Sequence, residues 1–284
     1  MSPERITKHP RIKINKLVFT LLLFSLLLVY SYPVFLTIIT SLKNDAEVIQ
    51  NPIGLPIQVS FGAFMRAWTT LHMGNLIMYS LLYSIGGTLL AILIAIGPAY
   101  ALGRFNIPGG NIVFVILLTG LMVPQQTVVI PLYEVLTKLS LLNNPLGLIM
   151  VHGVYGTAFV LLVLRGFIGS VPKELEDAAR MDGCNDFRLL SDIFLPLLMP
   201  GILVAGVLNI INIWRELFFA LIFLNNDAIN PVTVGLIKVT QSTYFSSWNL
   251  PAAAVLISQI PIVLIYIVAY QWIQQGMMAG AVKG

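Results

Sequence analysis

Charged residues are scarce in this chain of 284 residues, because its 16 Lys and Arg and 12 Asp and Glu make up only 10% of it. A soluble domain carries roughly 25% charged residues, so this chain has too few of them to cover a globule with a hydrated surface. With 57% apolar residues and a mean hydropathy of +0.88, the composition also excludes a disordered chain, a coiled coil and a nucleic-acid-binding module. These proportions predict an integral membrane protein.

Several kinds of chemical site are missing as well. The single cysteine, Cys184, excludes a disulfide framework and a cysteine-based metal site. His72 and His152 lack metal-ligand spacing, and we interpret both as packing or interfacial residues. The sequence has no G-x-x-x-x-G-K-[ST] loop for a nucleotide, no G-x-S-x-G and no H-E-x-x-H. We therefore expect no catalytic residue, no metal and no cofactor in this chain.

Long uncharged runs are abundant, and a helix needs about 20 mostly apolar residues to cross a bilayer. The runs are continuous and lack the alternating pattern of a strand barrel. They predict an all-α polytopic membrane protein with one transmembrane domain, residues 17–284, after an N-terminal tail, residues 1–16. The six predicted spans are approximately 17–39, 76–100, 112–133, 145–164, 197–224 and 252–272.

The distribution of Lys and Arg predicts the orientation, since cytoplasmic loops hold an excess of them. With the N-terminus inside, 11 cations lie in inner segments and 4 in outer segments, and Arg215 lies within a span. Both termini should therefore be cytoplasmic. The inner cations are Arg5, Lys8, Arg11, Lys13, Lys16, Arg104, Arg165, Lys173, Arg180, Arg188 and Lys283, and the outer ones are Lys43, Arg66, Lys138 and Lys238.

Polar residues inside the predicted spans are few. Arg215 and Glu216 interrupt the fifth span, where an ionisable group costs about 2.5–3.5 kcal/mol on insertion scales. They either face a water-filled pathway or contact a neighbouring helix. Gln125 and Gln126 lie in the third span beside Pro124, where a proline tends to kink the helix. The two amides either line a cavity or satisfy carbonyl groups freed by the kink.

One charged segment, residues 170–196, stands out between the fourth and fifth spans. Pro172 and the acids after it suit the start of a helix, and Gly183 permits the turn that ends it. A second helix is expected from Asn185 toward Phe194. The segment is either an ordinary solvated loop or a docking surface. It holds half of the 12 acidic residues: Glu174, Glu176, Asp177, Asp182, Asp186 and Asp192.

The same segment resembles the EAA loop of bacterial binding-protein-dependent ABC importer permeases. Asp177-Ala178-Ala179, three residues, Gly183, nine residues and Ile193-x-Leu195-Pro196 reproduce the spacing of that loop, with Asp177 where the family usually has Glu. The chain is most similar to the carbohydrate-uptake type, such as the smaller permease of the maltose transporter. Shorter motifs support this: Ser41-Leu42-Lys43, Ala99-Tyr100-Ala101-Leu102-Gly103-Arg104, Pro131-Leu132-Tyr133 and Gly280-Ala281-Val282-Lys283-Gly284.

The resemblance implies a permease that forms half of a sugar pathway in the prokaryotic inner membrane. Its implied partners are a second, different permease, an ATPase dimer that binds ATP and Mg, an extracytoplasmic solute-binding protein, the sugar and membrane lipid, with no nucleic acid. Implied ATPase-coupling residues are Glu174, Asp177, Ala178, Ala179, Asp182, Gly183, Ile193, Leu195 and Pro196. Substrate-pathway candidates are Gln125, Gln126, Trp214, Arg215 and Glu216, and Arg215 departs from the family's usual Trp-Asn-acid pattern.

Three other functions remain alternatives at this point. A secondary, ion-coupled transporter needs coupling-ion sites at membrane depth, and Arg215 with Glu216 is the only ionisable pair within a predicted span. An ABC permease for a non-sugar solute, such as a glycerol phosphate, would share the loop motif. A multi-pass membrane enzyme would need a catalytic cluster, which the sequence lacks.

Overall fold

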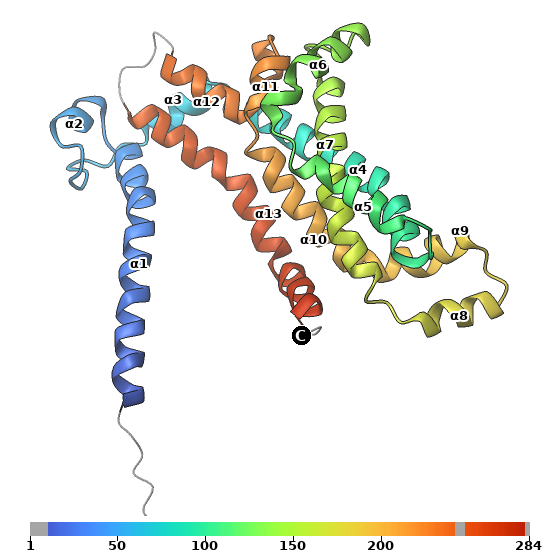
Figure 1. Cartoon of the computed structure of the whole chain (residues 1–284). Helices are drawn as coiled ribbons and strands as arrows, with labels where there is room; N and C mark the ends of the chain where they lie inside the picture. Colours follow the sequence, from blue (N-terminus) through green and yellow to red (C-terminus); the bar gives the residue numbers. More distant parts are fainter. Residues whose placement is uncertain (1–10, 242–247, 282–284) are drawn as a thin grey trace, which may run out of the picture. The chain divides into compact units, whose positions relative to one another are not determined.

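The computed structural model describes residues 11–241 and 248–281, and every regular element in these ranges is a helix (Figure 1). Residues 1–10 of the predicted tail and Val282, Lys283 and Gly284 of the C-terminal motif lie outside the described residues. The α-helices are α1 Arg11–Ser41, α2 Asp45–Gln50, α3 Gly62–Thr70, α4 Met73–Arg104, α5 Gly110–Leu118, α6 Gln125–Lys138, α7 Pro145–Ile168, α8 Lys173–Met181, α9 Asp186–Arg188, α10 Leu195–Trp214, α11 Phe218–Phe223, α12 Val232–Gln241 and α13 Asn249–Ala281. Short 3₁₀-helices cover Thr119–Leu121 and Asp227–Ile229, and a π-helix covers Leu189–Phe194.

Membrane-spanning helices account for most of the predicted apolar runs. Among the described residues, 5 helical segments are long and apolar enough to cross a bilayer, and a bent pair would make 6. The all-α, multi-pass fold class is therefore confirmed. The five segments are Val18–Ser41, Met73–Arg104, Pro145–Ile168, Asp186–Trp214 and Asn249–Tyr270.

The predicted third span is a bent pair of helices. Gly110–Leu121 and Gln125–Lys138 meet at 92°. The break falls just before Pro124, where a proline disfavours helical backbone at the preceding residue, and Pro124 itself is extended and precedes α6. Pro131 lies within α6 without ending it. The bend places Gln125 at the start of a helix, where its surroundings differ from those of a straight span.

The predicted fifth span, 197–224, is divided into two helices, α10 and α11. Helix α10 ends at Trp214, and α11 begins only at Phe218, so Arg215, Glu216 and Leu217 form a break. At the other end, α9, the π-helix and α10 form one segment, Asp186–Trp214, so the second helix of the charged loop continues into the span. Pro196 lies in the first turn of α10, where its missing N–H is tolerated after the wider π-helical turn.

The core of the larger compact unit, residues 68–242 and 257–284, contains α4, α7 and α10, which lie against one another (Figure 1). Small residues allow the close approach that membrane helices use for packing. Ala91, Ala95 and Ala99 recur every four residues on α4 and are completely buried. On α7, a Cβ added at Gly153 would lie 2.5 Å from Leu90 Cδ2. The packing of α7 and α10 against α4 positions two of the helices that line the cavity described below.

The smaller compact unit, residues 1–67 and 243–256, contains α1 and the loop that follows it. Lys43 is completely buried, and its Nζ donates hydrogen bonds to the carbonyl oxygens of Asn51 at 2.6 Å and Pro52 at 3.3 Å. Asp45 forms a two-armed ion pair with Arg66 at 2.8 Å, and these hydrogen bonds lower the pKa of Asp45. The Ser41-Leu42-Lys43 motif therefore organises a folded loop.

Candidate functional site

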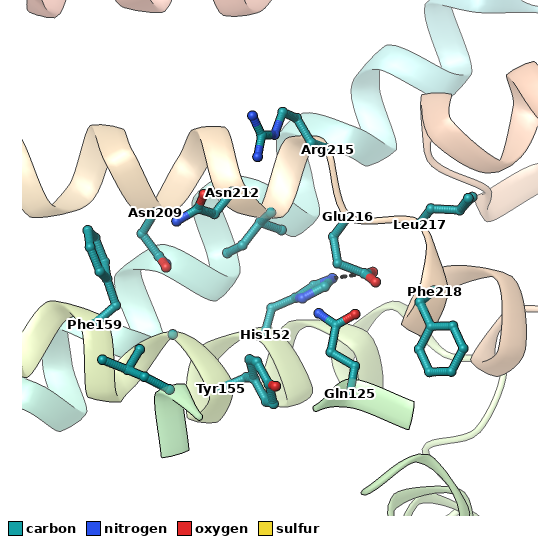
Figure 2. Close-up of a pocket in the computed structure, with 13 residues that line it drawn as sticks. Gln125, His152, Tyr155, Phe159, Asn209, Asn212, Arg215, Glu216, Leu217 and Phe218 are labelled. Atoms are coloured by element: carbon teal, nitrogen blue, oxygen red, sulfur yellow. Dashed lines mark ion pairs between the residues drawn. The ribbon is translucent and has the colours of Figure 1, made fainter. Parts of the chain in front are cut away.

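A cavity of about 500 Å³ lies beside the break between α10 and α11 (Figure 2). Its walls come from α6, α7 and the end of α10, and they combine aromatic rings with amide and ionisable groups. Gln125, Arg215 and Glu216, three of the predicted pathway residues, line it together. The other polar residues of its lining are His152, Tyr155, Asn209 and Asn212.

The remaining pathway candidates lie elsewhere. Trp214 is buried and lines a second cavity, of about 480 Å³, between α10, α12 and α13. Gln126 is exposed and lines neither cavity. Arg215 lines both cavities. The structure thus gathers three of the five candidates at one cavity and places Arg215 at the boundary of the two.

Glu216 has a structural role that the sequence left open. Its carboxylate accepts hydrogen bonds from the backbone N–H groups of Phe219 at 2.9 Å and Ala220 at 3.4 Å, at the start of α11. His152 Nε2 lies 3.8 Å from the same carboxylate, as the dashed line in Figure 2 marks. A carboxylate is favoured at the positive end of a helix. These contacts favour the alternative in which Glu216 contacts neighbouring elements.

Replacing Glu216 by Ala should lower the stability of the protein by about 0.5–2 kcal/mol, the range measured for loss of a helix cap. The two amides of α11 would then lose their acceptor in a site that is largely closed to water. Thermal unfolding of the purified protein in detergent measures the effect. Glu134→Ala, which removes an exposed carboxylate from α6, is the control. Equal melting temperatures for the two variants would contradict the capping role.

The pathway residues predicted in the sequence analysis do not include four polar residues of the cavity lining: His152, Tyr155, Asn209 and Asn212. His152, interpreted there as packing or interfacial, is buried at the cavity wall, with its ring centroid 6.3 Å from that of Phe219. Asn209 is buried, and its Nδ2 donates a hydrogen bond to Thr88 Oγ1 at 3.0 Å. His152 and Asn209 are polar side chains within largely apolar spans, and that signal could have marked both as candidates.

The charged loop between α7 and α10 is anchored to the end of α4. Arg104 is almost completely buried, and one of its Nη atoms donates a hydrogen bond to the carbonyl oxygen of Val171 at 2.6 Å. Its Nε lies 3.6 Å from a carboxylate oxygen of Glu176, and its guanidinium carbon lies 4.8 Å from the ring centroid of Phe194. The contacts by which Arg104 joins the two ends of this loop were not predictable from the sequence, because its partners lie more than 65 residues away.

The two alanines of the motif face in different directions. Ala178 is exposed, whereas Ala179 is buried in the cluster that includes Leu189 and Phe194. Gly183 has φ +83, so the predicted turn requires the left-handed conformation that glycine adopts without strain. Of the pair, only Ala178 is available to a partner, and Ala179 serves the internal packing of the loop.

The loop exposes both apolar and acidic side chains. Leu175, Met181 and Phe187 are 46%, 88% and 77% exposed. Arg180 pairs with Glu176 at 3.0 Å and Asp186 at 2.8 Å, and these hydrogen bonds raise the pKa of Arg180. Among the other predicted coupling residues, Ile193 and Leu195 are half-buried, and an exposed set comprises Glu174, Asp177, Asp182 and Pro196.

Comparison with known proteins identifies the family. Residues 87–279 match the family described as "Binding-protein-dependent transport system inner membrane component". The chain belongs to this family. The match covers the cavity lining and the whole anchored loop, and the protein is therefore a multi-pass membrane permease of an ABC importer, as the EAA resemblance predicted. Membership favours this function over the secondary transporter and the membrane enzyme.

Similar proteins support the assignment over most of the permease's length. This chain is 31% identical to the sulfoquinovosyl glycerol transport system permease protein SmoH of Agrobacterium fabrum, with 89% of each chain covered. It is 29% identical to the diacetylchitobiose uptake system permease protein DasC of Streptomyces coelicolor, with 89% of this chain and 92% of the relative covered. A solved bacterial ABC transporter involved in the import of the acidic polysaccharide alginate has the same fold, with a TM-score of 0.82, 24% identity, and 94% of this chain and 99% of that chain covered.

Proposed function

We propose that this permease forms half of the pathway of an ATP-driven importer for a sugar or oligosaccharide. The second half would come from a different permease, and an extracytoplasmic binding protein would deliver the solute. The sugar assignment is supported by the relatives named above and by the probable starch degradation products transport system permease protein AmyC of Thermoanaerobacterium thermosulfurigenes, which is 27% identical over 96% of this chain. A glycerol phosphate or another non-sugar solute is the second candidate.

The exposed apolar side chains of the anchored loop are the observation that supports coupling. Large apolar side chains exposed together on a loop between spans are typical of an interaction site. ATP and Mg would be bound by a separate ATPase dimer that docks on Leu175, Met181 and Phe187. Force on the loop would pass through Arg104 to α4 and through the continuous segment Asp186–Trp214 to the cavity. This arrangement requires the loop and both termini to be cytoplasmic.

The test is reconstitution of the importer that co-purifies with the tagged permease. In proteoliposomes, binding protein loaded with solute should stimulate ATP hydrolysis, and uptake of labelled sugar should require ATP. The isolated permease should show no saturable nucleotide binding, since it lacks a phosphate-binding loop. Uptake driven by an ion gradient without ATP, or nucleotide binding by the permease alone, would refute the proposal. Transport of glycerol phosphate but of no sugar would select the second candidate.

A further inference from the structure

Arg215 occupies an unusual position in this molecule, because it lines two cavities of the larger unit. One cavity lies against α6 and α7, and the other lies against α12 and α13. In Figure 2 its side chain extends from the end of α10 on the side away from His152. A solute in either cavity would therefore meet the same guanidinium group.

The charge of Arg215 is not balanced by its neighbours. Within the part of the chain that the structure describes, no carboxylate oxygen lies within 4.0 Å of its guanidinium group. The adjacent Glu216 does not form an ion pair with Arg215. Its carboxylate accepts hydrogen bonds from two backbone N–H groups of α11 and lies near His152. An uncompensated cation beside an apolar span is costly unless water or an anionic group reaches it. The exposed guanidinium is thus free to bind an anion.

The walls around this charge suit a saccharide. On one side, Gln125 and Asn212 offer amide groups and Tyr155 offers a ring. On the other side, Gln259 offers an amide, and Trp214 and Tyr266 offer rings. Sugar hydroxyls bind to amides, and the apolar faces of sugar rings pack on aromatic side chains. A guanidinium group binds carboxylate, sulfonate or phosphate groups through paired N–H donors.

We infer that Arg215 recognises an acidic group on the transported saccharide, so that this importer takes up an anionic sugar or oligosaccharide. The inference rests on the proposed function, which fixes the solute as a saccharide, and adds its charge. Arg215 would contact the acid, and the amides on both sides would contact the hydroxyl groups. An uncharged sugar would leave the guanidinium without a counter-charge during passage.

The experiment compares acidic and neutral saccharides in one mixture. Proteoliposomes that hold the complete importer and its binding protein receive equal amounts of neutral oligosaccharides from cellulose, starch and chitin and uronic-acid oligosaccharides from polygalacturonate. Mass spectrometry of the lumen gives the ratio of acidic to neutral solute. The wild type should import acidic saccharides in excess. Arg215→Met should lower this ratio about ten- to a hundredfold, the loss expected for a charge-assisted hydrogen-bonded pair, and Arg215→Lys should lie between the two.

The ratio separates recognition from assembly, since a smaller amount of intact importer lowers the uptake of both classes alike. Lys238→Met is the matched control, because it removes a cation that pairs with Asp227 and lines neither cavity. An unchanged ratio in Arg215→Met, or wild-type import of neutral saccharides only, would overturn the role of Arg215 and leave the proposed function intact. Import of no saccharide would instead overturn the proposed function, and this inference with it.

Discussion

Importer complexes purified through a permease with Phe187→Asp should have lost most of their ATPase. The Phe187 side chain is 77% exposed in α9, within the anchored loop. Burying a phenylalanine at an interface contributes about 1.5–3 kcal/mol, so its loss should weaken ATPase binding about ten- to a hundredfold. A carboxylate at that interface adds a desolvation cost. The permease itself should fold normally, because an acid suits the start of a helix.

Quantitative pull-down of the ATPase measures this loss, and Met181→Asp should reproduce it at the other exposed end of the loop. Phe61→Asp is the matched control, since Phe61 is 67% exposed in the loop that follows α1, which we expect on the opposite side of the membrane. Full retention of the ATPase by both Phe187→Asp and Met181→Asp would show that the loop is not the docking surface.

Arg104→Ala should uncouple ATP hydrolysis from transport while the ATPase stays bound. Arg104 holds the start of the loop through Val171 and Glu176 and its end through the Phe194 ring. Hydrogen bonds that involve charged groups contribute about 1.5–3 kcal/mol each, so their loss should let the loop move independently of α4. The docking residues would remain exposed, but a movement of the loop would no longer be transmitted to α4. We expect uptake to fall about tenfold or more at an unchanged rate of ATP hydrolysis per bound ATPase.

Arg188→Ala is the control for this prediction, because it removes an exposed arginine from the same loop and leaves the anchor intact. The double variant Arg104→Ala/Glu176→Ala should lose less transport than the summed losses of the two single variants, since the two side chains share one contact. Normal uptake by Arg104→Ala, or an additive loss in the double variant, would contradict the anchoring role.

The secondary structure was predictable where a single physical constraint dominates. Crossing a bilayer requires a continuous apolar helix, so the runs around α1, α4, α7 and α13 were visible as segments without charge. The turn at Gly183 was predictable because few other residues accept φ near +83. The bends in the helices were harder to predict from the sequence. Proline marked the break before Gln125, but the separation of α10 from α11 has no proline or glycine within Arg215–Leu217.

The candidate sites were predictable by residue type but not by contact. Composition and charge identified a membrane protein, and the EAA spacing identified the loop, because both are local properties of the chain. Only the tertiary structure paired Arg104 with Glu176, turned Ala179 inward, directed Glu216 to α11 and left Arg215 between two cavities. Each of these outcomes depends on which residues from distant helices lie within a few ångströms. Neighbouring residues at a helix end point about 100° apart, so the packing around α10 decided that Glu216 contacts the start of α11 while Arg215 is exposed beside two cavities.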